Sequence, residues 1–378
     1  MLYLDILNDK PAVIDSKFAS LFDELEKGHL DTKERLNAFK ETGEELNQRL
    51  LEEMIEFESW RFQIMDQLGE ITEDFNPTQQ SAHQQFIRET KYFAIVQEAP
   101  FYWRIINKPN GYAGDADMMS YIYRNEFEGD SPFGKFIHKH AVSTKACESV
   151  RNRKRYLTEQ ILKTEDGRIL SLAAGPAEEI KETIGTAKKC NHEFVALDHD
   201  LDTLKKYKPE NNGFNFTYAL ANAFQIISEN YFAARPRSLF ENYCFPRTDF
   251  KGLRKVISSL KYEVIDLKER KFNLIYSAGL YDYIKTFPLD DSKGSVALTK
   301  NLFALLESGG TLMVGNFNRN NPRDLRFVME YIYDWQLIYR DKYDIMEFVR
   351  SIDENEIKSV QIIEEPLGIN YFLLIEKV

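Results

Sequence analysis

Cysteine and histidine are scarce in this sequence. Its 378 residues include three cysteines, Cys147, Cys190 and Cys244, and six histidines, of which His138 and His140 are the closest pair. An odd number of cysteines without metal-ligand spacing argues against both a disulfide framework and a zinc site. The histidine pair has no acidic or cysteine neighbour that would complete a ligand set. We therefore expect reduced thiols and no metal.

Long apolar runs and an excess of positive charge are also lacking. No segment reaches the roughly 20 apolar residues of a membrane span, and residues 1–10 lack the basic start and apolar stretch of a targeting signal. The 60 acidic and 49 basic residues give a formal net charge of −11, which offers no electrostatic footprint for nucleic acid. We expect a cytoplasmic enzyme with a small-molecule acceptor.

Two kinds of periodicity divide the chain. From about residue 32 to residue 70, apolar residues recur at three- and four-residue steps, which is typical of a helix with one buried face. Asn76-Pro77 predicts another helix start. After residue 150, strands and helices alternate. We therefore predict an N-terminal helical domain over 1–150 and a Rossmann-like domain over 151–378. The N-terminal helices are interpreted either as a packing or homodimer surface or as a cap over the cofactor cleft.

The second domain is predicted to be an α/β fold with a mainly parallel sheet. The connection 366–369 between the last two strands is too short to cross over a parallel sheet, so it predicts an antiparallel hairpin. An aromatic- and arginine-rich stretch, 224–262, interrupts the alternation as an insertion. Seven strands with a reversed last strand are the arrangement of class I methyltransferases that use S-adenosylmethionine (SAM). The strands are predicted at 169–173, 193–198, 214–219, 272–277, 310–316, 359–364 and 370–377.

The turn after the first strand is poor in glycine. Ser171, Ala173 and Gly175 are small residues that leave room for a ligand at the carboxyl end of the strand, and Asp198 ends the next strand, where a carboxylate accepts hydrogen bonds from ribose hydroxyls. A single glycine departs from the three-glycine turn that passes a pyrophosphate, so a cofactor without phosphates, such as SAM, fits better. An ordinary tight turn is the alternative.

Two later strand ends carry further candidates. Asn222 and Ala223 follow the third strand, where the side-chain amide and a backbone amide are placed to meet an adenine edge, while an asparagine turn is the alternative. The segment 277–283 closes the fourth strand at the edge where open α/β sheets bind ligands. Its candidates are Ser277 and Gly279 for the cofactor and Tyr281 and Tyr283 for catalysis, with aromatic packing as the alternative.

Two segments outside the predicted sheet complete the candidates. The glycine-rich loop 107–117 contains Tyr112 and Asp115, and irregular loops on rigid scaffolds often carry binding residues. A purely structural Asx-type turn between two helices is the alternative. The basic run 151–155 precedes the first strand, either as a solvated linker helix or as a salt bridge to the cap or to the cofactor carboxylate.

Over roughly residues 100–378 the chain resembles a group of class I SAM-dependent methyltransferases, the extracellular-factor 3-hydroxypalmitic acid methyl ester biosynthesis proteins. The resemblance rests on ordered motifs at 111–115, 151–155, 172–178, 196–200, 279–283 and 330–340. It implies SAM held by the turn 171–177, by Asp198 at the ribose and by Asn222 with Ala223 at the adenine. Tyr112, Asp115 and the segment 281–283 would then lie near the sulfonium.

The resemblance implies methyl transfer to a small-molecule or fatty-acid-like acceptor. Two other functions stay open from the sequence. The same fold can transfer or cyclise the aminocarboxypropyl group of SAM with release of methylthioadenosine. Alternatively, the chain is a non-catalytic SAM- or nucleotide-binding protein whose N-terminal helices meet a partner. Methyl transfer itself needs mainly alignment, so a base is needed only for an amine or hydroxyl acceptor, and Asp115 or Tyr112 is then the first catalytic candidate.

Overall fold

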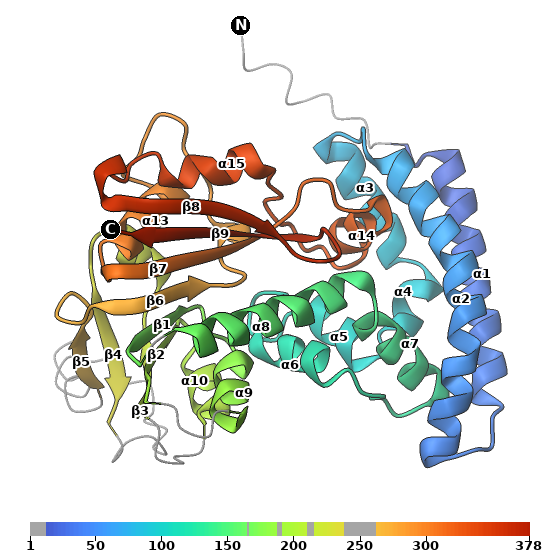
Figure 1. Ribbon diagram of the computed structural model, residues 1–378. Coiled ribbons are helices and arrows are strands. Elements are labelled where there is room, and N and C mark those ends of the chain that lie inside the picture. The colour runs from blue at the N-terminus through green and yellow to red at the C-terminus, as the bar shows by residue number, and fades with distance from the viewer. Residues whose placement is uncertain (1–12, 165, 187–190, 210–214, 238–261) are drawn as a thin grey trace, which may run out of the picture. The chain divides into compact units, whose positions relative to one another are not determined.

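The computed structural model describes residues 13–164, 166–186, 191–209, 215–237 and 262–378. The chain forms two compact units, one of residues 1–148 with 321–336, the other of residues 149–320 with 337–378. Figure 1 shows that the described part of the first unit is helical and that the second contains the sheet. The sequence predicted a single continuous domain over 151–378, whereas 321–336 belongs to the first unit. Within the described residues no helix is long and apolar enough to cross a membrane.

The first unit is a set of helices around an aromatic core. The apolar residues of the 32–70 pattern fall on two helices rather than one, because the chain breaks at 38–42 and restarts at Gly43 with φ +57°. The start predicted at Asn76-Pro77 is confirmed, since Asn76 caps the next helix and forms a capping box with Gln79. The helices are α1 (Ser16–Asn37), α2 (Gly43–Thr72), α3 (Pro77–Arg88), α4 (Lys91–Val96), α5 (Pro100–Asn107), α6 (Ala116–Arg124) and α7 (Pro132–Val142).

The excursion 321–336 joins this core through aromatic packing. It consists of α14 (Arg323–Phe327) and the π-helical turn η4 (Val328–Ile332). Phe327 is 1% exposed, and its ring centroid lies 6.0 Å from that of Phe18 on α1. The segment packs on the helical core rather than with its sequence neighbours because burying a phenylalanine side chain in an existing core removes apolar surface from water.

The second unit is built on a nine-stranded sheet in the order β5-β4-β3-β2-β1-β6-β7-β9-β8. Strands β1, β2, β3, β6 and β7 run parallel, while β9 is antiparallel to both β7 and β8. The strands are β1 (Arg168–Leu172), β2 (Glu193–Asp198), β3 (Asn215–Leu220), β4 (Phe232–Pro236), β5 (Tyr262–Asp266), β6 (Phe272–Ser277), β7 (Leu306–Phe317), β8 (Ile357–Glu364) and β9 (Asn370–Lys377).

Nine strands rather than seven result from the 224–262 insertion. Its described parts supply β4, while β5 begins at Tyr262, and these two strands pair antiparallel at the β3 edge. The rest of that stretch, 238–261, lies outside the described residues. The remaining seven strands keep the reversed final strand that the short connection predicted, with β9 inside the sheet and β8 at its edge.

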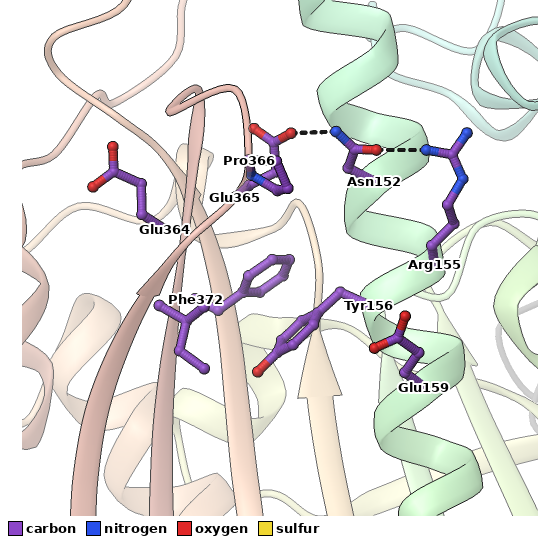
Figure 2. A pocket seen from close by; sticks show the side chains of 9 residues that line it. Asn152, Arg155, Tyr156, Glu159, Glu364, Glu365, Pro366 and Phe372 are labelled. Carbon is purple, nitrogen blue, oxygen red and sulfur yellow. Dashed lines mark hydrogen bonds between the residues drawn. The ribbon is translucent and has the colours of Figure 1, made fainter.

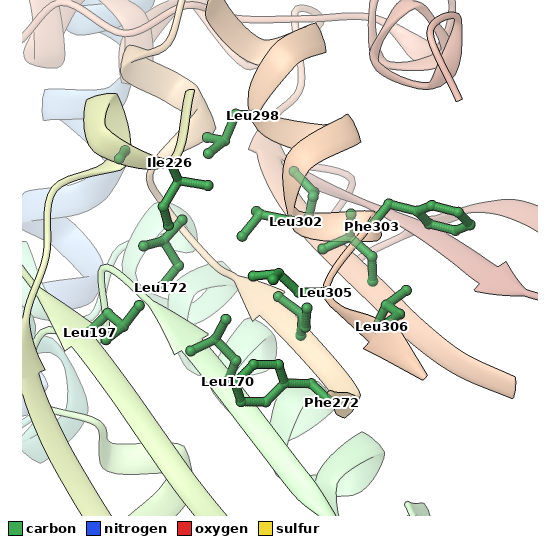
Figure 3. Packing of buried hydrophobic residues seen from close by; sticks show 14 of the residues in the cluster. Leu170, Leu172, Leu197, Ile226, Phe272, Leu298, Leu302, Phe303, Leu305 and Leu306 are labelled. Carbon is green, nitrogen blue, oxygen red and sulfur yellow. The ribbon is translucent and has the colours of Figure 1, made fainter. Parts of the chain in front are cut away.

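Helices cover both faces of this sheet because the inner strands are apolar on both sides. Successive residues of a strand point to opposite faces, so Leu170 and Leu172 join one core cluster while Ile169 joins the other. Figure 3 shows the first cluster, in which Leu298 and Leu302 of α13 pack toward the strands. The helices of this unit are α8 (Lys145–Lys163), which starts just before it, α9 (Glu178–Thr186), α10 (Leu201–Tyr207), α11 (Ala223–Ile227), α13 (Gly294–Phe303), α15 (Lys342–Met346) and the 3-10 turns η3 (Tyr281–Tyr283), η5 (Glu347–Val349) and η6 (Glu354–Glu356).

Candidate functional site

The turn between β1 and α9 has an unusual backbone. Ala173, Gly175 and Ala177 all adopt left-handed conformations, with φ of 55°, 53° and 48°. Only glycine adopts this region without strain, and for alanine it costs about 1–2 kcal/mol per residue. The turn is held by hydrogen bonds from Ala174 N to Leu197 O at 3.0 Å and from Ala177 N to Ala174 O at 2.9 Å. Strain of this kind at the carboxyl edge of a parallel sheet is typical of a binding site.

Asp198 fastens this turn to the end of β2. Its side chain is 5% exposed; Oδ2 accepts a hydrogen bond from Gly175 N at 2.9 Å, and Oδ1 accepts one from Asp200 N at 3.0 Å. His199 Nδ1 lies 3.3 Å from Oδ1, and this carboxylate raises the pKa of His199. The sequence paired Asp198 with the turn on spacing alone, and the structure brings the two into contact. Oδ2 has a further lone pair for a ligand hydroxyl, because Gly175 N is its one protein donor among the described residues.

The two candidate serines lie inside the sheet layer. Ser171 is 2% exposed and Ser277 is 1% exposed. Ser277 Oγ donates to Leu172 O at 3.0 Å, so it ties β6 to the end of β1. The Ser277 hydroxyl therefore supports the strand ends from within, and neither serine lines a surface in this structure.

Asn222 and Ala223 begin α11 at the end of β3. Asn222 Oδ1 accepts from Phe224 N at 2.8 Å, and Gln225 Oε1 accepts from Asn222 N at 2.8 Å, which is a capping box. The asparagine is exposed, and Phe224 beside it is 65% exposed. Capping thus accounts for the asparagine carbonyl, while an exposed aromatic ring at a strand end is available to a planar ligand.

Arg153 of α8 lies against Gly279, just after β6. A Cβ built on Gly279 would lie 3.3 Å from Arg153 Nη2 and 3.4 Å from Nη1. The arginine is 5% exposed, and Nη1 has no hydrogen-bond partner among the residues that the structure describes. Sequence reasoning singled out the run 151–155 but did not pick this residue, because a helix must be placed on its sheet before one basic side chain is known to face inward.

Asp282 lies within the segment 277–283 that the sequence places at the ligand edge of the sheet. It is 2% exposed, and Oδ1 accepts from Phe317 N at 2.7 Å, while Oδ2 accepts no hydrogen bond from the described chain. Burial raises the pKa of Asp282 from 3.8 to about 6, against the opposing effects of the Phe317 amide, Arg153 and Arg340. A carboxyl group with one anchored oxygen and a pKa near neutrality is suited to general acid–base work.

Arg340 holds this turn in place. Its guanidinium donates to Tyr281 O at 2.7 Å, to Asn316 Oδ1 at 2.6 Å and to Ile284 O at 2.5 Å. It is 3% exposed, and burial lowers its pKa. The acceptors of Arg340 are all neutral, so its positive charge is not cancelled by an ion pair. That charge favours the ionised form of Asp282.

The two candidate tyrosines of this turn differ sharply in exposure. Tyr281 is fully buried; its hydroxyl hydrogen bonds with Thr299 Oγ1 at 3.0 Å, and burial raises its pKa. Tyr283 is 43% exposed. Tyr281 is therefore a core residue in this structure, while Tyr283 presents its side chain to solvent.

Tyr112 and Asp115 belong to the first unit. Asp115 is 1% exposed and caps α6, accepting from Met118 N at 2.8 Å and from Arg104 Nε at 2.7 Å. The helix cap and the hydrogen bond from Arg104 give the Asp115 carboxylate a structural role, and we do not assign it a role in proton transfer. Tyr112 is half-buried. Within the described residues no group of three potential ligands for a metal gathers in either unit.

A hollow of about 310 Å³ lies between α8 and the β8–β9 hairpin. Figure 2 shows Tyr156 and Phe372 lining it, with ring centroids 4.8 Å apart. Asn152 links its two charged sides, donating to Glu365 Oε1 and accepting from Arg155 Nη1, both at 2.5 Å. The hydrogen bonds of these groups are made within the wall, so we assign this hollow no ligand.

No protein-family model and no curated protein matches this chain. Among solved structures, a possible exported protein from Bordetella parapertussis shares 12% identity at a TM-score of 0.47, over 80% of this chain and 89% of that one. A DUF574 family protein from Streptomyces avermitilis shares 14% identity at 0.40, over 75% and 99%. The N-methyltransferase NodS from Bradyrhizobium japonicum, solved with S-adenosyl-L-homocysteine (SAH), shares 10% at 0.34, over 61% and 87%. Because these identities and TM-scores are low, function is inferred from the sheet topology and from the residues at the carboxyl edge of the sheet.

Proposed function

We propose that this protein is a SAM-dependent transferase that methylates a small-molecule acceptor. The observation that carries the proposal is the left-handed turn 173–177, locked by Gly175 N to the carboxylate of Asp198 on the neighbouring strand. Its single glycine suits a nucleoside without phosphates better than a dinucleotide. The sheet order, with a reversed β9 beside β7, supports the same proposal.

The residues at this edge fit such a cofactor in type and placement. Asp198 retains acceptor capacity for ribose hydroxyls, and Ala223 with Phe224 offers a backbone amide and an exposed ring for the adenine. Gly279 leaves the backbone open beside the guanidinium of Arg153. When bound, SAM supplies an activated methyl group on a sulfonium. The protein's own task is then to align the acceptor with it.

Asp282 is our candidate for removing a proton from an acceptor hydroxyl or amine. Its anchored Oδ1 fixes the carboxyl group while Oδ2 accepts no hydrogen bond from the described residues. Among the four catalytic candidates from the sequence, Tyr283 is the exposed one on the same turn, and we propose that it lines the acceptor side. A carboxylate acceptor would need no base.

The test is binding of SAH, measured by calorimetry on the full chain. Asp198→Ala should weaken it about 10- to 100-fold, because charge-assisted hydrogen bonds to the ribose contribute about 1.5–3 kcal/mol. Asp202→Ala is the matched control, since Asp202 lies four residues away with its side chain 93% exposed. Absence of SAH binding to the wild-type chain, or tight binding by Asp198→Ala, contradicts the proposal.

Product identification separates methyl transfer from the other SAM chemistry. Mass spectrometry of the nucleoside released from SAM should find SAH. Methylthioadenosine instead would show transfer or cyclisation of the aminocarboxypropyl group and would replace the methyltransferase proposal with that reaction.

A further inference from the structure

Arg153 is a buried cation that contacts no anionic group among the residues that the structure describes. It is 5% exposed, and its Nη1 is enclosed without a hydrogen-bond partner in the described ranges. The guanidinium remains charged at any pH at which the protein is folded and carries five donors. Burying such a group without a partner costs free energy, and a ligand that brings a hydrogen-bond acceptor to Arg153 would offset that cost.

The neighbouring carboxyl groups do not supply this acceptor. Burial raises the pKa of both Glu179 and Asp282 while the charge of Arg153 opposes that rise, yet neither carboxyl group forms an ion pair with it. Each has another partner: Glu179 Oε1 accepts from Tyr276 Oη at 2.7 Å, and Asp282 Oδ1 accepts from Phe317 N at 2.7 Å.

The position of Arg153 indicates which part of a ligand would supply the anion. Its guanidinium lies over Gly279, two residues past β6, and β6 pairs with β1 in parallel, Ser171 opposite Tyr276. Arg153 therefore stands beside the strand whose end carries the left-handed turn. An anion here would belong to the molecule held by that turn, and a guanidinium matches a carboxylate in a bidentate geometry.

We propose that Arg153 binds the α-carboxylate of the cofactor's amino-acid portion, so that this edge selects nucleosides carrying an amino acid over nucleosides without one. The inference rests on the proposed function, because it takes the turn to be the nucleoside site. Gly279 contributes by having no side chain, since a methyl group there would press on the guanidinium at 3.3 Å.

The experiment compares two probes on the full chain by calorimetry, SAH and 5′-methylthioadenosine, which shares the nucleoside but lacks the amino acid. The wild type should bind SAH more tightly. Arg153→Gln should weaken SAH binding about 10- to 100-fold and leave methylthioadenosine binding unchanged. Arg155→Gln removes the same charge from an exposed position on α8 and should alter neither affinity.

Two further variants guard against a folding defect. Arg153→Lys keeps the charge without the bidentate fork and should give an intermediate SAH affinity. Gly279→Ala keeps Arg153 itself and is free of backbone strain, because the φ of Gly279 is not positive; it should reduce the preference for SAH. Unchanged methylthioadenosine binding shows that the site of each variant is folded.

The outcomes are distinguishable. Equal binding of both probes by the wild type overturns the role of Arg153 while leaving the nucleoside site intact, as does an equal loss of both in Arg153→Gln. Binding of neither probe by the wild type overturns the proposed function instead.

Discussion

Replacing Asp282 by asparagine should stabilise the sheet unit at neutral pH and change little in acid. In the folded chain burial raises the pKa of Asp282 from 3.8 to about 6. Between these values the unfolded chain has released the proton while the folded chain still holds it, so stability falls as pH rises through this window. The loss amounts to about 3 kcal/mol at neutral pH, at about 1.4 kcal/mol for each tenfold change in the proton affinity.

Asparagine cannot ionise, and its Oδ1 can still accept from Phe317 N. The free energy of unfolding of Asp282→Asn, relative to the wild type, should therefore rise by about 2 kcal/mol between about pH 4 and about pH 7, since a small part of the loss is already present at about pH 4. Comparing two pH values cancels any constant effect of the substitution. Because Asp282 is our candidate for proton transfer, Asp282→Asn would gain stability and lose activity, which is a stability–activity trade-off.

Urea unfolding followed by circular dichroism measures this difference. The exposed Asp202→Asn is the control for the substitution type. A difference that is the same at both pH values, or that grows in favour of the wild type, refutes the reasoning.

Four other substitutions have expected outcomes. Phe224→Ala should leave the thermal midpoint unchanged, because the ring is 65% exposed, and weaken SAH binding up to about tenfold through lost stacking; wild-type affinity contradicts its contact with adenine. Gly175→Ala should lower the free energy of unfolding by about 1 kcal/mol through the φ of 53° alone, since no atom lies within 4 Å of the added methyl. The matched change in a helix, Gly185→Ala, should instead raise the free energy of unfolding by about 0.5–1 kcal/mol. Changes of the same sign in the two variants would refute backbone strain at Gly175. Asp115→Asn should lower the free energy of unfolding by about 1.5–3 kcal/mol, because the buried hydrogen bonds to Arg104 lose their charged acceptor while Arg104 keeps its ion pair with Asp117; an unchanged urea midpoint would contradict that.

Local patterns predicted the elements that local physics controls. The capping signal at Asn76-Pro77 gave a helix start, because a cap satisfies backbone donors within one turn. The short connection 366–369 gave an antiparallel pairing, because its length forbids a crossover. The spacing from Gly175 to Asp198 indicated a shared strand-end site, and the two residues are hydrogen-bonded at 2.9 Å.

Burial and long-range packing decided what the sequence could not. Tyr281 and Tyr283 look alike in the sequence, yet one is fully buried and the other is 43% exposed. The segment 321–336 left its sequence neighbours for the helical unit, where an aromatic core receives Phe327.

The sequence by itself determined the alternation of strands and helices, the reversed last strand and the small-residue turn followed by an acidic strand end, because periodicity, connection length and side-chain size act over a few residues. Only the tertiary structure decided that Arg153 is a buried cation over Gly279 and that Asp282 has a pKa of about 6. Desolvation depends on everything packed around a group, and those neighbours come from segments more than a hundred residues apart.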